Sequence, residues 1–239
     1  MNMIMLATTR DSYLRSLTET SLESLRRSAL PGGDGLDCVN VVVVESVPGA
    51  APYAQAEVTI QRRPGPFNYN TALNEGIAAA EGAFAPSKWW CFANNDIVFA
   101  QDWLVEIGKA LAADPDIAAI SPNQRLRKPG VDVGYVLQKN FDGCCFMLRE
   151  DALRKIAPFD EAFKFYFQDD DILEQLRLLG AKSARALSSK IFHLGSETTK
   201  PTGPALADGL QTFIRKYSKD VYLRNEAAKR EFWRQCGEI

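Results

Sequence analysis

The sequence predicts an α/β protein in which helices cover both faces of a mostly parallel sheet. Short apolar runs alternate with segments of helical periodicity through the first half of the chain, which is typical of parallel strands joined by crossover helices. The chain has 239 residues, of which 46% are hydrophobic, so one large core is expected rather than two small ones. Polar side chains follow several of the apolar runs, where open α/β sheets bind ligands.

The first half of the chain divides clearly into strands and helices. Short runs rich in apolar and β-branched residues predict strands at 3–7, 39–44, 57–61, 89–92 and 117–121. Apolar residues at helical spacing predict helices at 12–29, 69–80 and 103–112.

The second half is less regular. Residues 124–140 are polar and show no clear period, which predicts a long loop of the kind that often forms a lid or a binding segment. Helices are expected at 151–157 and 169–180, short strands at 184–187 and 191–192, and one or two packing helices from Gly203 onward. No flexible linker separates these parts. We therefore expect one domain at 1–200, with 201–239 as a helical extension packed on it.

Composition excludes several classes of function. The net charge of −2 gives no overall basic field for nucleic-acid binding, and the apolar runs are too short to cross a bilayer. The N-terminus lacks the basic start of a signal peptide, so a soluble, cytoplasmic chain is expected.

The cysteines and the single histidine exclude two further kinds of site. Five cysteines without a C-x-x-C pair, together with one histidine, argue against structural zinc and against a disulfide framework. Cys144 and Cys145 lie in an apolar run and are interpreted as small buried residues. The full set is Cys38, Cys91, Cys144, Cys145 and Cys236.

The end of the apolar run 89–92 is the first candidate site. It leads directly into Asn94, Asn95 and Asp96, which would lie beyond the carboxyl end of a strand. Carboxylate oxygens suit a hard divalent cation, so Asp96 is a candidate metal ligand.

Three consecutive carboxylates form a second candidate. Asp169, Asp170 and Asp171 follow the aromatic stretch 163–167, and carboxylates crowded against apolar rings can acquire the raised pKa of a general base. Alternatively, Asp169 and Asp170 merely cap the helix that follows them.

Two further residues stand at strand ends. His193 closes a short apolar run, and it would be either a structural histidine or a metal ligand that shares an ion with Asp96. Glu45 ends the valine-rich run, where acidic residues of nucleotide-binding α/β proteins accept hydrogen bonds from a ribose or a nucleobase.

Taken together, these residues resemble a known family. The segments that carry the resemblance are 66–77, 79–82, 92–96, 143–145, 149–150 and 159–171, followed by Arg177, Gly180 and His193. In this order they are similar to the inverting family 2 glycosyltransferases of the GT-A fold, a Rossmann-like fold that binds nucleotide-diphosphate sugars. Rhamnosyltransferase-like members are the nearest.

The resemblance implies a metal site and a catalytic base. Asp96 matches the last carboxylate of the family's Asp-x-Asp motif, which coordinates Mn²⁺ or Mg²⁺ at the donor diphosphate, and His193 matches the histidine that completes this site. Asp169 matches the base that deprotonates the acceptor hydroxyl, and Asp171 would support it. Gln168 stands where the family usually has Glu, and the loss of that charge should ease ionisation of Asp169.

The resemblance also implies a donor pocket. Its expected members are Thr8, Arg10, Glu45, Asn68, Asn74, Asn94, Asn95 and Gly143. Asn94 replaces the first Asp of the metal motif and is expected to bind the donor sugar or ribose rather than the metal. Glu45 and Ser46 depart from the usual Asp-led motif, so donors linked to UDP, dTDP or GDP all remain open.

The implied activity is transfer of one sugar from a nucleotide-diphosphate donor to an acceptor hydroxyl. A glycan or glycoconjugate is the favoured acceptor. A protein or a hydroxylated nucleic-acid base is possible, in which case Arg62, Arg63 and the cluster 125–128 would face phosphates, although these arginines fit an ordinary solvated loop better. Without transmembrane helices, a processive polysaccharide synthase is not expected.

Two other functions are weighed against this one. A nucleotidyltransferase would also use strand-end carboxylates and a metal, but residues 8–10 are not the Gly-rich phosphate loop that it requires. An inactive nucleotide-sugar-binding module is the third possibility, and the presence of Asp96, Asp169 and His193 argues against it.

Overall fold

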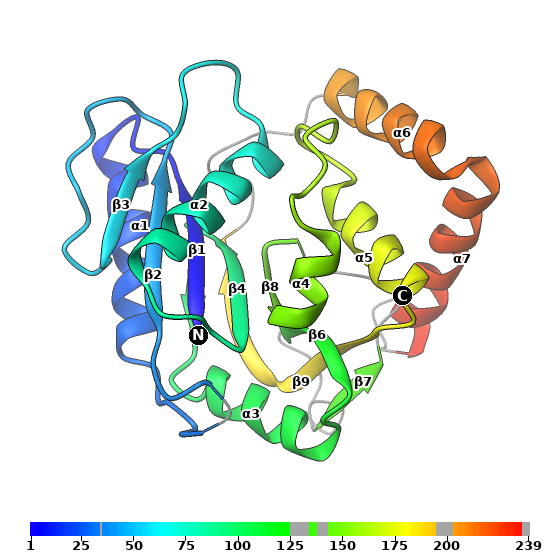
Figure 1. Cartoon of the computed structure of the whole chain (residues 1–239), viewed down its shortest axis with the longest axis horizontal. Helices are drawn as coiled ribbons and strands as arrows, with labels where there is room; N and C mark the ends of the chain where they lie inside the picture. Colours follow the sequence, from blue (N-terminus) through cyan, green and yellow to red (C-terminus); the bar gives the residue numbers. More distant parts are fainter. Residues whose placement is uncertain (34, 125–133, 138–142, 195–202, 236–239) are drawn as a thin grey trace.

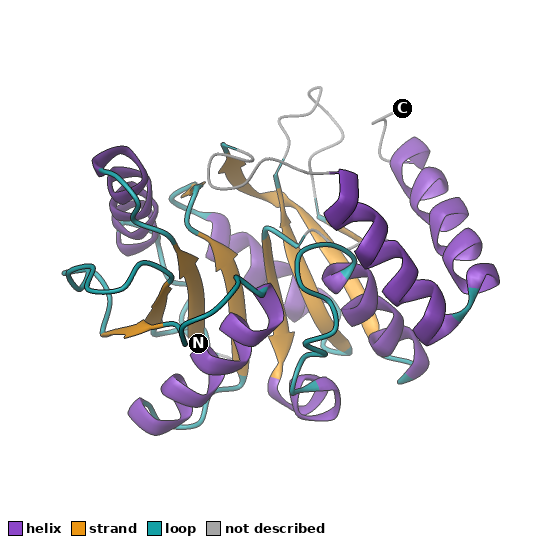
Figure 2. Ribbon diagram, turned by 90° about the horizontal axis from the view of Figure 1, so that it is seen from above, coloured by secondary structure: helices purple, strands orange, loops and turns teal. Residues whose placement is uncertain are grey.

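The computed structural model describes residues 1–33, 35–124, 134–137, 143–194 and 203–235. Within these residues, nine strands form one sheet and seven helices flank it (Figure 1). Seen from above, helices lie on both sides of the sheet, as the alternating pattern predicts (Figure 2).

The N-terminal half of the sheet is parallel. Its strands are β1 (Asn2–Ala7), β2 (Asn40–Glu45), β3 (Val58–Gln61) and β4 (Trp89–Asn94), in the order β3-β2-β1-β4. The central strands β1, β2 and β4 are almost wholly buried, because helices cover both faces. All four predicted strands are confirmed.

The other half of the sheet contains both parallel and antiparallel pairs of strands. The predicted mostly parallel arrangement therefore holds only for the N-terminal half. β8 (Cys145–Arg149) inserts antiparallel between β4 and β6 (Ile117–Asn123). β9 (Lys182–His193) is parallel to β6, while β5 (Ile97–Phe99) and β7 (Tyr135–Leu137) are antiparallel to β9. β8 was not predicted as a strand, because its apolar run was interpreted only as a buried segment, and such a run indicates neither a strand nor its direction without further signals.

Two predictions in this half need correction. The expected short strands at 184–187 and 191–192 form one strand, β9, whose pairing with β6 is irregular near the polar residues that interrupt the apolar pattern. The expected loop at 124–140 contains β7, and residues 125–133 and 138–140 lie outside the described part of the chain.

The helices divide between two apolar layers. On one face α1 (Ser12–Arg26) and α3 (Trp103–Ala113) cover the sheet. On the other face lie α2 (Tyr69–Ala83), α4 (Glu150–Ile156) and α5 (Gln168–Leu178).

The C-terminal helices α6 (Gly203–Tyr217) and α7 (Lys219–Gln235) pack outside α5 (Figure 1). Phe213 and Phe232 are buried, and the Phe232 ring lies under the guanidinium of Arg185 from β9. The C-terminal extension thus contacts both a helix and a strand of the α/β part of the chain. The boundary between a domain at 1–200 and an extension at 201–239 stays a prediction.

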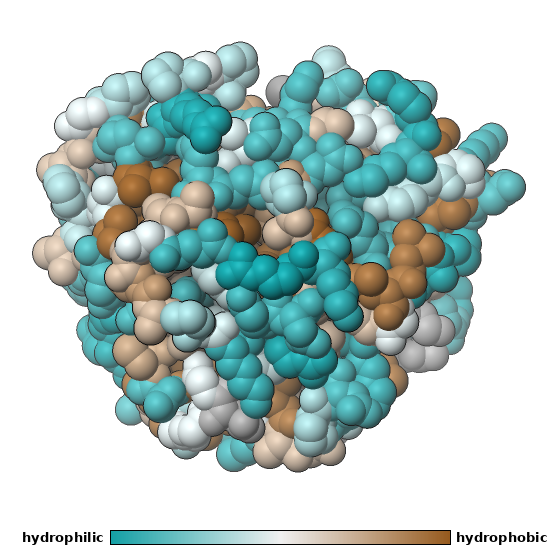
Figure 3. Space-filling view, in the orientation of Figure 1, coloured by the Kyte–Doolittle hydropathy of each residue, from teal (hydrophilic) through white to brown (hydrophobic). Residues whose placement is uncertain are grey.

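The described residues contain no helix long and apolar enough to cross a membrane. The face seen in Figure 3 is mainly hydrophilic, with small and separate apolar areas. Among the described residues, Cys91, Cys144 and Cys145 are buried and Cys38 is exposed, and none of the four forms a disulfide, whereas Cys236 lies outside the described part of the chain.

Candidate active site

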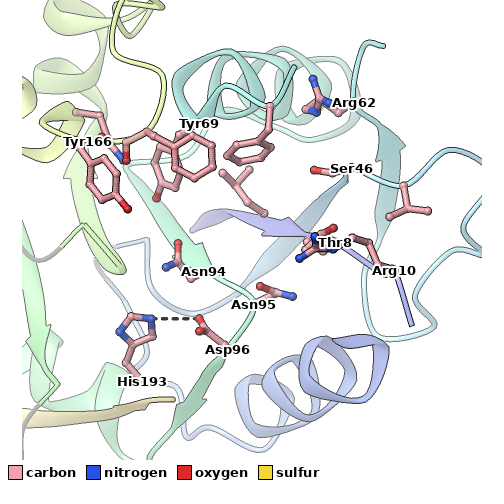
Figure 4. A pocket seen from close by; sticks show the side chains of 16 residues that line it. Thr8, Arg10, Ser46, Arg62, Tyr69, Asn94, Asn95, Asp96, Tyr166 and His193 are labelled. Carbon is pink, nitrogen blue, oxygen red and sulfur yellow. Dashed lines mark hydrogen bonds and ion pairs between the residues drawn. The ribbon is translucent and has the colours of Figure 1, made fainter. Parts of the chain in front are cut away.

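A pocket of about 440 Å³ opens where parallel strands end (Figure 4). Leu6 and Ala7 end β1 and Thr8 follows it, Ser46 and Val47 follow β2, and Asn94 ends β4. The volume is in the range of small-molecule sites, and the carboxyl edge of the sheet is where α/β proteins bind ligands. The remaining lining residues are Arg10, Arg62, Phe67, Tyr69, Asn95, Asp96, Phe165, Tyr166, Gln168 and His193.

Asp96 and His193 face each other in this pocket. The Nε2 atom of His193 lies 3.2 Å from Oδ1 of Asp96 (Figure 4). The antiparallel pairing of β5 with β9 produces this contact, since Ile97 pairs with His193 and the Leu194 N–H donates to the Asp96 carbonyl oxygen at 3.0 Å. Thus the structure brings together the two residues that the sequence analysis predicts as metal ligands.

The contacting atoms of this pair fit a divalent cation. Asp96 Oδ1 and His193 Nε2 are both buried, and neither has a hydrogen-bond partner among the described residues, because their contact lacks hydrogen-bond geometry. Buried polar atoms without partners are costly, and carboxylate oxygen and imidazole nitrogen are common metal ligands. Within the described residues, no three His, Cys, Asp or Glu side chains are grouped so that they could hold a metal ion, so further ligands would come from water or a bound phosphate.

The two asparagines before Asp96 have different surroundings. Asn95 is buried, and its Nδ2 donates to Oγ1 of Thr18 on α1 at 2.8 Å, which fixes its side chain. Asn94 is held by its backbone N–H, which donates to the Cys144 carbonyl oxygen at 2.9 Å, and its carboxamide points into the pocket (Figure 4). Asn94 is therefore the better placed of the two to bind a ligand.

The three carboxylates at the start of α5 also differ from one another. Asp170 forms an ion pair of 2.6 Å with Lys229 of α7. Asp171 is wholly buried and accepts a hydrogen bond of 2.7 Å from the Tyr217 hydroxyl of α6. Among the described residues, Asp169 alone of the three has no ion-pair or side-chain partner, so it is the most available for chemistry.

Asp169 lies at the edge of the pocket rather than in its lining. A Cβ atom on Gly143 would come within 3.2 Å of the Asp169 Cβ, so the two residues touch. The Gly143 carbonyl oxygen in turn accepts a hydrogen bond of 3.0 Å from the hydroxyl of Tyr69, which lines the pocket. Gly143 therefore lets the carboxylate approach the pocket closely.

The surroundings of Asp169 suit a proton acceptor. Burial, reinforced by the negative charge of Asp170, raises the pKa of Asp169 to about 7, while the Lys229 ammonium opposes the rise. A base is most effective when its pKa lies near the working pH. Gln168 lines the pocket beside it, with its Nε2 donating to the Phe165 carbonyl oxygen at 2.9 Å.

Glu45 does not line the pocket. It is wholly buried, and its Oε1 accepts hydrogen bonds from the backbone N–H groups of Thr9 at 3.0 Å and Val47 at 2.8 Å. Its Oε2 accepts from the Tyr53 hydroxyl at 2.8 Å and from the Thr9 hydroxyl. The Glu45 carboxylate thus joins the loops that follow β1 and β2. In this geometry it does not face the pocket, so it is not placed to make the expected contact with a nucleobase.

Glu45→Ala should reduce stability by about 3 kcal/mol, because it leaves several buried donors without acceptors. Urea unfolding measures this loss, and Glu45→Gln, which keeps one acceptor oxygen, should lose less. Calorimetry with nucleotides completes the test. A Glu45→Gln protein of normal stability that has lost nucleotide binding would instead mean that the carboxylate contacts the ligand.

Asn68 and Asn74 also lie outside the pocket lining. Asn68 caps α2 by accepting from the Thr71 N–H at 3.2 Å, and Asn74 exchanges two hydrogen bonds with the backbone of Phe159, at 2.8 and 2.9 Å. Like Asp171, these predicted site residues make contacts that stabilise the fold around the pocket.

An aromatic wall was not predicted as part of the site. Phe67 and Phe165 pack with ring centroids 5.2 Å apart, and both line the pocket with Tyr69 and Tyr166 (Figure 4). The aromatic stretch 163–167 is visible in the sequence, but its periodicity does not reveal which rings face a cavity.

The arginines considered for nucleic-acid binding have local partners where they are described. Arg62 lines the pocket and donates to the carbonyl oxygens of Gly65 at 2.8 Å and Pro66 at 3.3 Å. Arg63 forms an ion pair of 3.1 Å with Glu75. The basic cluster 125–128 lies outside the described residues.

No protein-family model and no curated protein matches the sequence. Solved structures do match in fold. One is the mannosyltransferase PcManGT from Pyrobaculum calidifontis in complex with GDP-Man and Mn²⁺, with a TM-score of 0.60 and 15% identity over 96% of this chain and 72% of that chain.

Two further structures match over most of this chain. GalNAc-T7 with UDP, GalNAc and Mn²⁺ has a TM-score of 0.63 and 11% identity over 90% of this chain, which spans 47% of that chain. S. aureus TarS 1–349 has a TM-score of 0.57 and 12% identity over 92% of this chain and 73% of that chain. Likeness at such low identity shows the fold alone. The chain has the GT-A fold of nucleotide-sugar glycosyltransferases.

Proposed function

We propose that this chain is a metal-dependent inverting glycosyltransferase that uses a nucleotide-diphosphate sugar. The observation that carries the proposal is the pair formed by Asp96 and His193. Two metal-ligating atoms, both buried and without hydrogen-bond partners among the described residues, face a pocket at the carboxyl edge of a GT-A sheet. Two structural neighbours, PcManGT with GDP-Man and Mn²⁺ and GalNAc-T7 with UDP, GalNAc and Mn²⁺, support the same proposal.

The residues of the pocket suggest how a donor would bind. Asp96 and His193 would hold Mn²⁺ or Mg²⁺, which when bound neutralises the charge that develops on the departing diphosphate. Thr8, Arg10 and Ser46, at the ends of β1 and β2, would bind the nucleoside. The Ser46 N–H donates to the Ala7 carbonyl oxygen at 3.0 Å, so the backbone on this side of the pocket is formed before a donor arrives and needs little ordering on binding.

The sugar and acceptor would lie on the other side of the metal pair. Asn94 would hydrogen-bond the sugar, which we propose is a hexose or deoxyhexose as in rhamnosyltransferase-like enzymes. Tyr69 and Tyr166 would pack against the sugar or against a glycan acceptor.

Asp169 would act as the base. Its carboxylate takes the proton of the acceptor hydroxyl, the hydroxyl oxygen forms the new bond to the anomeric carbon, and the nucleoside diphosphate leaves from the opposite face with the bonding electron pair. One displacement of this kind inverts the anomeric configuration. Gln168 and Gly143 would hold the carboxylate at the edge of the pocket.

A panel of nucleotide sugars linked to UDP, dTDP or GDP tests the proposal through thermal unfolding. We expect one donor class to raise the melting temperature by several degrees with Mn²⁺ and by much less with EDTA, because a ligand stabilises the state that binds it. No shift with any donor, at concentrations that stabilise a known glycosyltransferase run in parallel, would contradict the proposed function.

A further inference from the structure

The C-terminal helix α7 lies along α5 through a pair of ionic contacts. Lys229 pairs with Asp170 at 2.6 Å, and Arg224 pairs with Glu174 at 2.6 Å, one turn further along α5. The order of the partners is reversed between the two helices, so α7 runs antiparallel to α5. We call these two ion pairs the α5–α7 ladder. One end of the ladder lies at the first turn of α5, where Asp169 is found.

The contact at that end is sheltered from water. The side chains of Lys229 and Asp170 are only 13% and 12% exposed, whereas Arg224 is 44% exposed. Charges that are withdrawn from water interact strongly with their neighbours and are weakly screened by salt. The backbone N–H of Asp170 also donates to Oδ1 of Asp169 at 3.0 Å, so the ion pair adjoins the base directly.

The backbone before α5 is held by the same extension. Phe167 has a left-handed backbone, with φ of +66°, which is strained for a large side chain. Its ring packs on Phe213 of α6 and on Tyr222 of α7, with centroid distances of 5.8 and 6.1 Å. Gly209 of α6 leaves room for this turn, since a Cβ there would come within 2.7 Å of the Tyr166 carbonyl oxygen. The extension thus shapes the turn that presents Asp169.

We propose that Lys229 is a positioning residue for Asp169: its ammonium group neutralises the buried Asp170 and thereby keeps the neighbouring base charged and ready to accept a proton. The proposal rests on the function proposed above and extends it, because it makes the C-terminal extension part of the catalytic apparatus.

The charges around Asp169 support this role. Asp170 on α5 and Lys229 on α7 act on it with opposite signs, and Glu226 on α7 adds negative charge near Asp170. Burial opposes the charged form of Lys229, but Asp170 and Asp169 together raise its pKa, so it stays cationic at neutral pH. Tyr69 on α2 stays neutral, since burial raises its pKa far above the working range. Lys229 is therefore the cation that favours the ionised form of Asp169.

The pH dependence of sugar transfer separates this role from a purely structural one. In Lys229→Met the acid limb of the pH–rate profile should move up by about one unit, so transfer below pH 7 should fall by about tenfold and recover at pH 9. In Lys229→Arg, which keeps the positive charge, the acid limb should return to its wild-type position. In Asp170→Asn the acid limb should move to lower pH, because the carboxylate that repels the charge of Asp169 is gone. Damage to the fold alone would not produce shifts of opposite sign.

A matched control and an independent readout complete the experiment. Arg224→Met removes the other cation of the α5–α7 ladder and should leave the acid limb in place. Carbon-13 NMR of aspartate carboxyls, with Asp169→Asn to assign the signal, follows the titration of Asp169 without any turnover, and Lys229→Met should raise its midpoint. An unshifted midpoint would overturn the role of Lys229. If the wild-type protein transfers no sugar but Lys229→Met still raises the Asp169 midpoint, the proposed function is overturned and the influence of Lys229 on Asp169 stands.

Discussion

Asp96→Asn should lower sugar transfer by about 10³-fold, because it removes the charge of the proposed metal ligand that lies opposite His193. The amide keeps the shape of the side chain but has no negative charge to hold a divalent cation. Donor hydrolysis or transfer measured with saturating Mn²⁺ checks this result. His193→Ala should show a smaller loss, about 10–100-fold, since a water molecule can replace one neutral ligand.

The control for Asp96→Asn is Asp102→Asn. Asp102 is exposed at the start of α3, lies outside the pocket lining and makes no capping hydrogen bond with its side chain. This variant should keep wild-type activity. Full activity of Asp96→Asn in EDTA would show that the reaction needs no metal at this site.

Asp169→Asn should lower kcat for transfer by about 10³-fold while donor binding changes by less than about twofold. The proposed base would act on the acceptor hydroxyl and would contribute little to holding the donor. Steady-state kinetics separates the two quantities, and Asp102→Asn again serves as the matched control. Wild-type turnover in Asp169→Asn would place the base elsewhere.

The same residue should govern the pH dependence of the wild-type protein. Only the ionised carboxylate accepts a proton, and its pKa is raised to about 7, chiefly by burial, so kcat should fall by about tenfold per pH unit below pH 7. Stability should change in the opposite direction. Because the folded pKa is raised, the ionised group disfavours the folded state as pH rises from about 4 to about 7. Asp169→Asn should therefore unfold at a higher temperature than wild type at pH 8, which distinguishes lost catalysis from lost folding.

Sequence pattern predicted the strands that create the pocket. The apolar runs that become β1, β2 and β4 are covered on both faces, and such strands have a strong signature. Their carboxyl ends fix the positions of Thr8 and Asn94 with little ambiguity. β8 was not predicted, because its apolar run was interpreted only as buried, and burial alone would not have given its antiparallel direction.

Polar residues were harder to assign, since their roles depend on partners far away in the chain. Glu45 and Asn74 have the residue types expected of a donor site, yet neither lines the pocket and their hydrogen bonds are made to Thr9, Val47 and Phe159. Arg62 was interpreted as part of a solvated loop, with nucleic-acid contacts as the alternative, and nothing local in the sequence indicates that it lines the pocket. The meeting of Asp96 and His193 required the pairing of β5 with β9, which no short-range pattern encodes.

The most direct test of the metal site is calorimetric titration of the matching nucleoside diphosphate into wild type and Asp96→Asn, each with Mn²⁺ and with EDTA. We expect wild type to bind at least about tenfold more tightly with Mn²⁺, a difference of about 1.4 kcal/mol, and Asp96→Asn to show the weaker affinity in both buffers. Equal affinity of wild type with Mn²⁺ and with EDTA would contradict a metal that joins Asp96 and His193 to the donor.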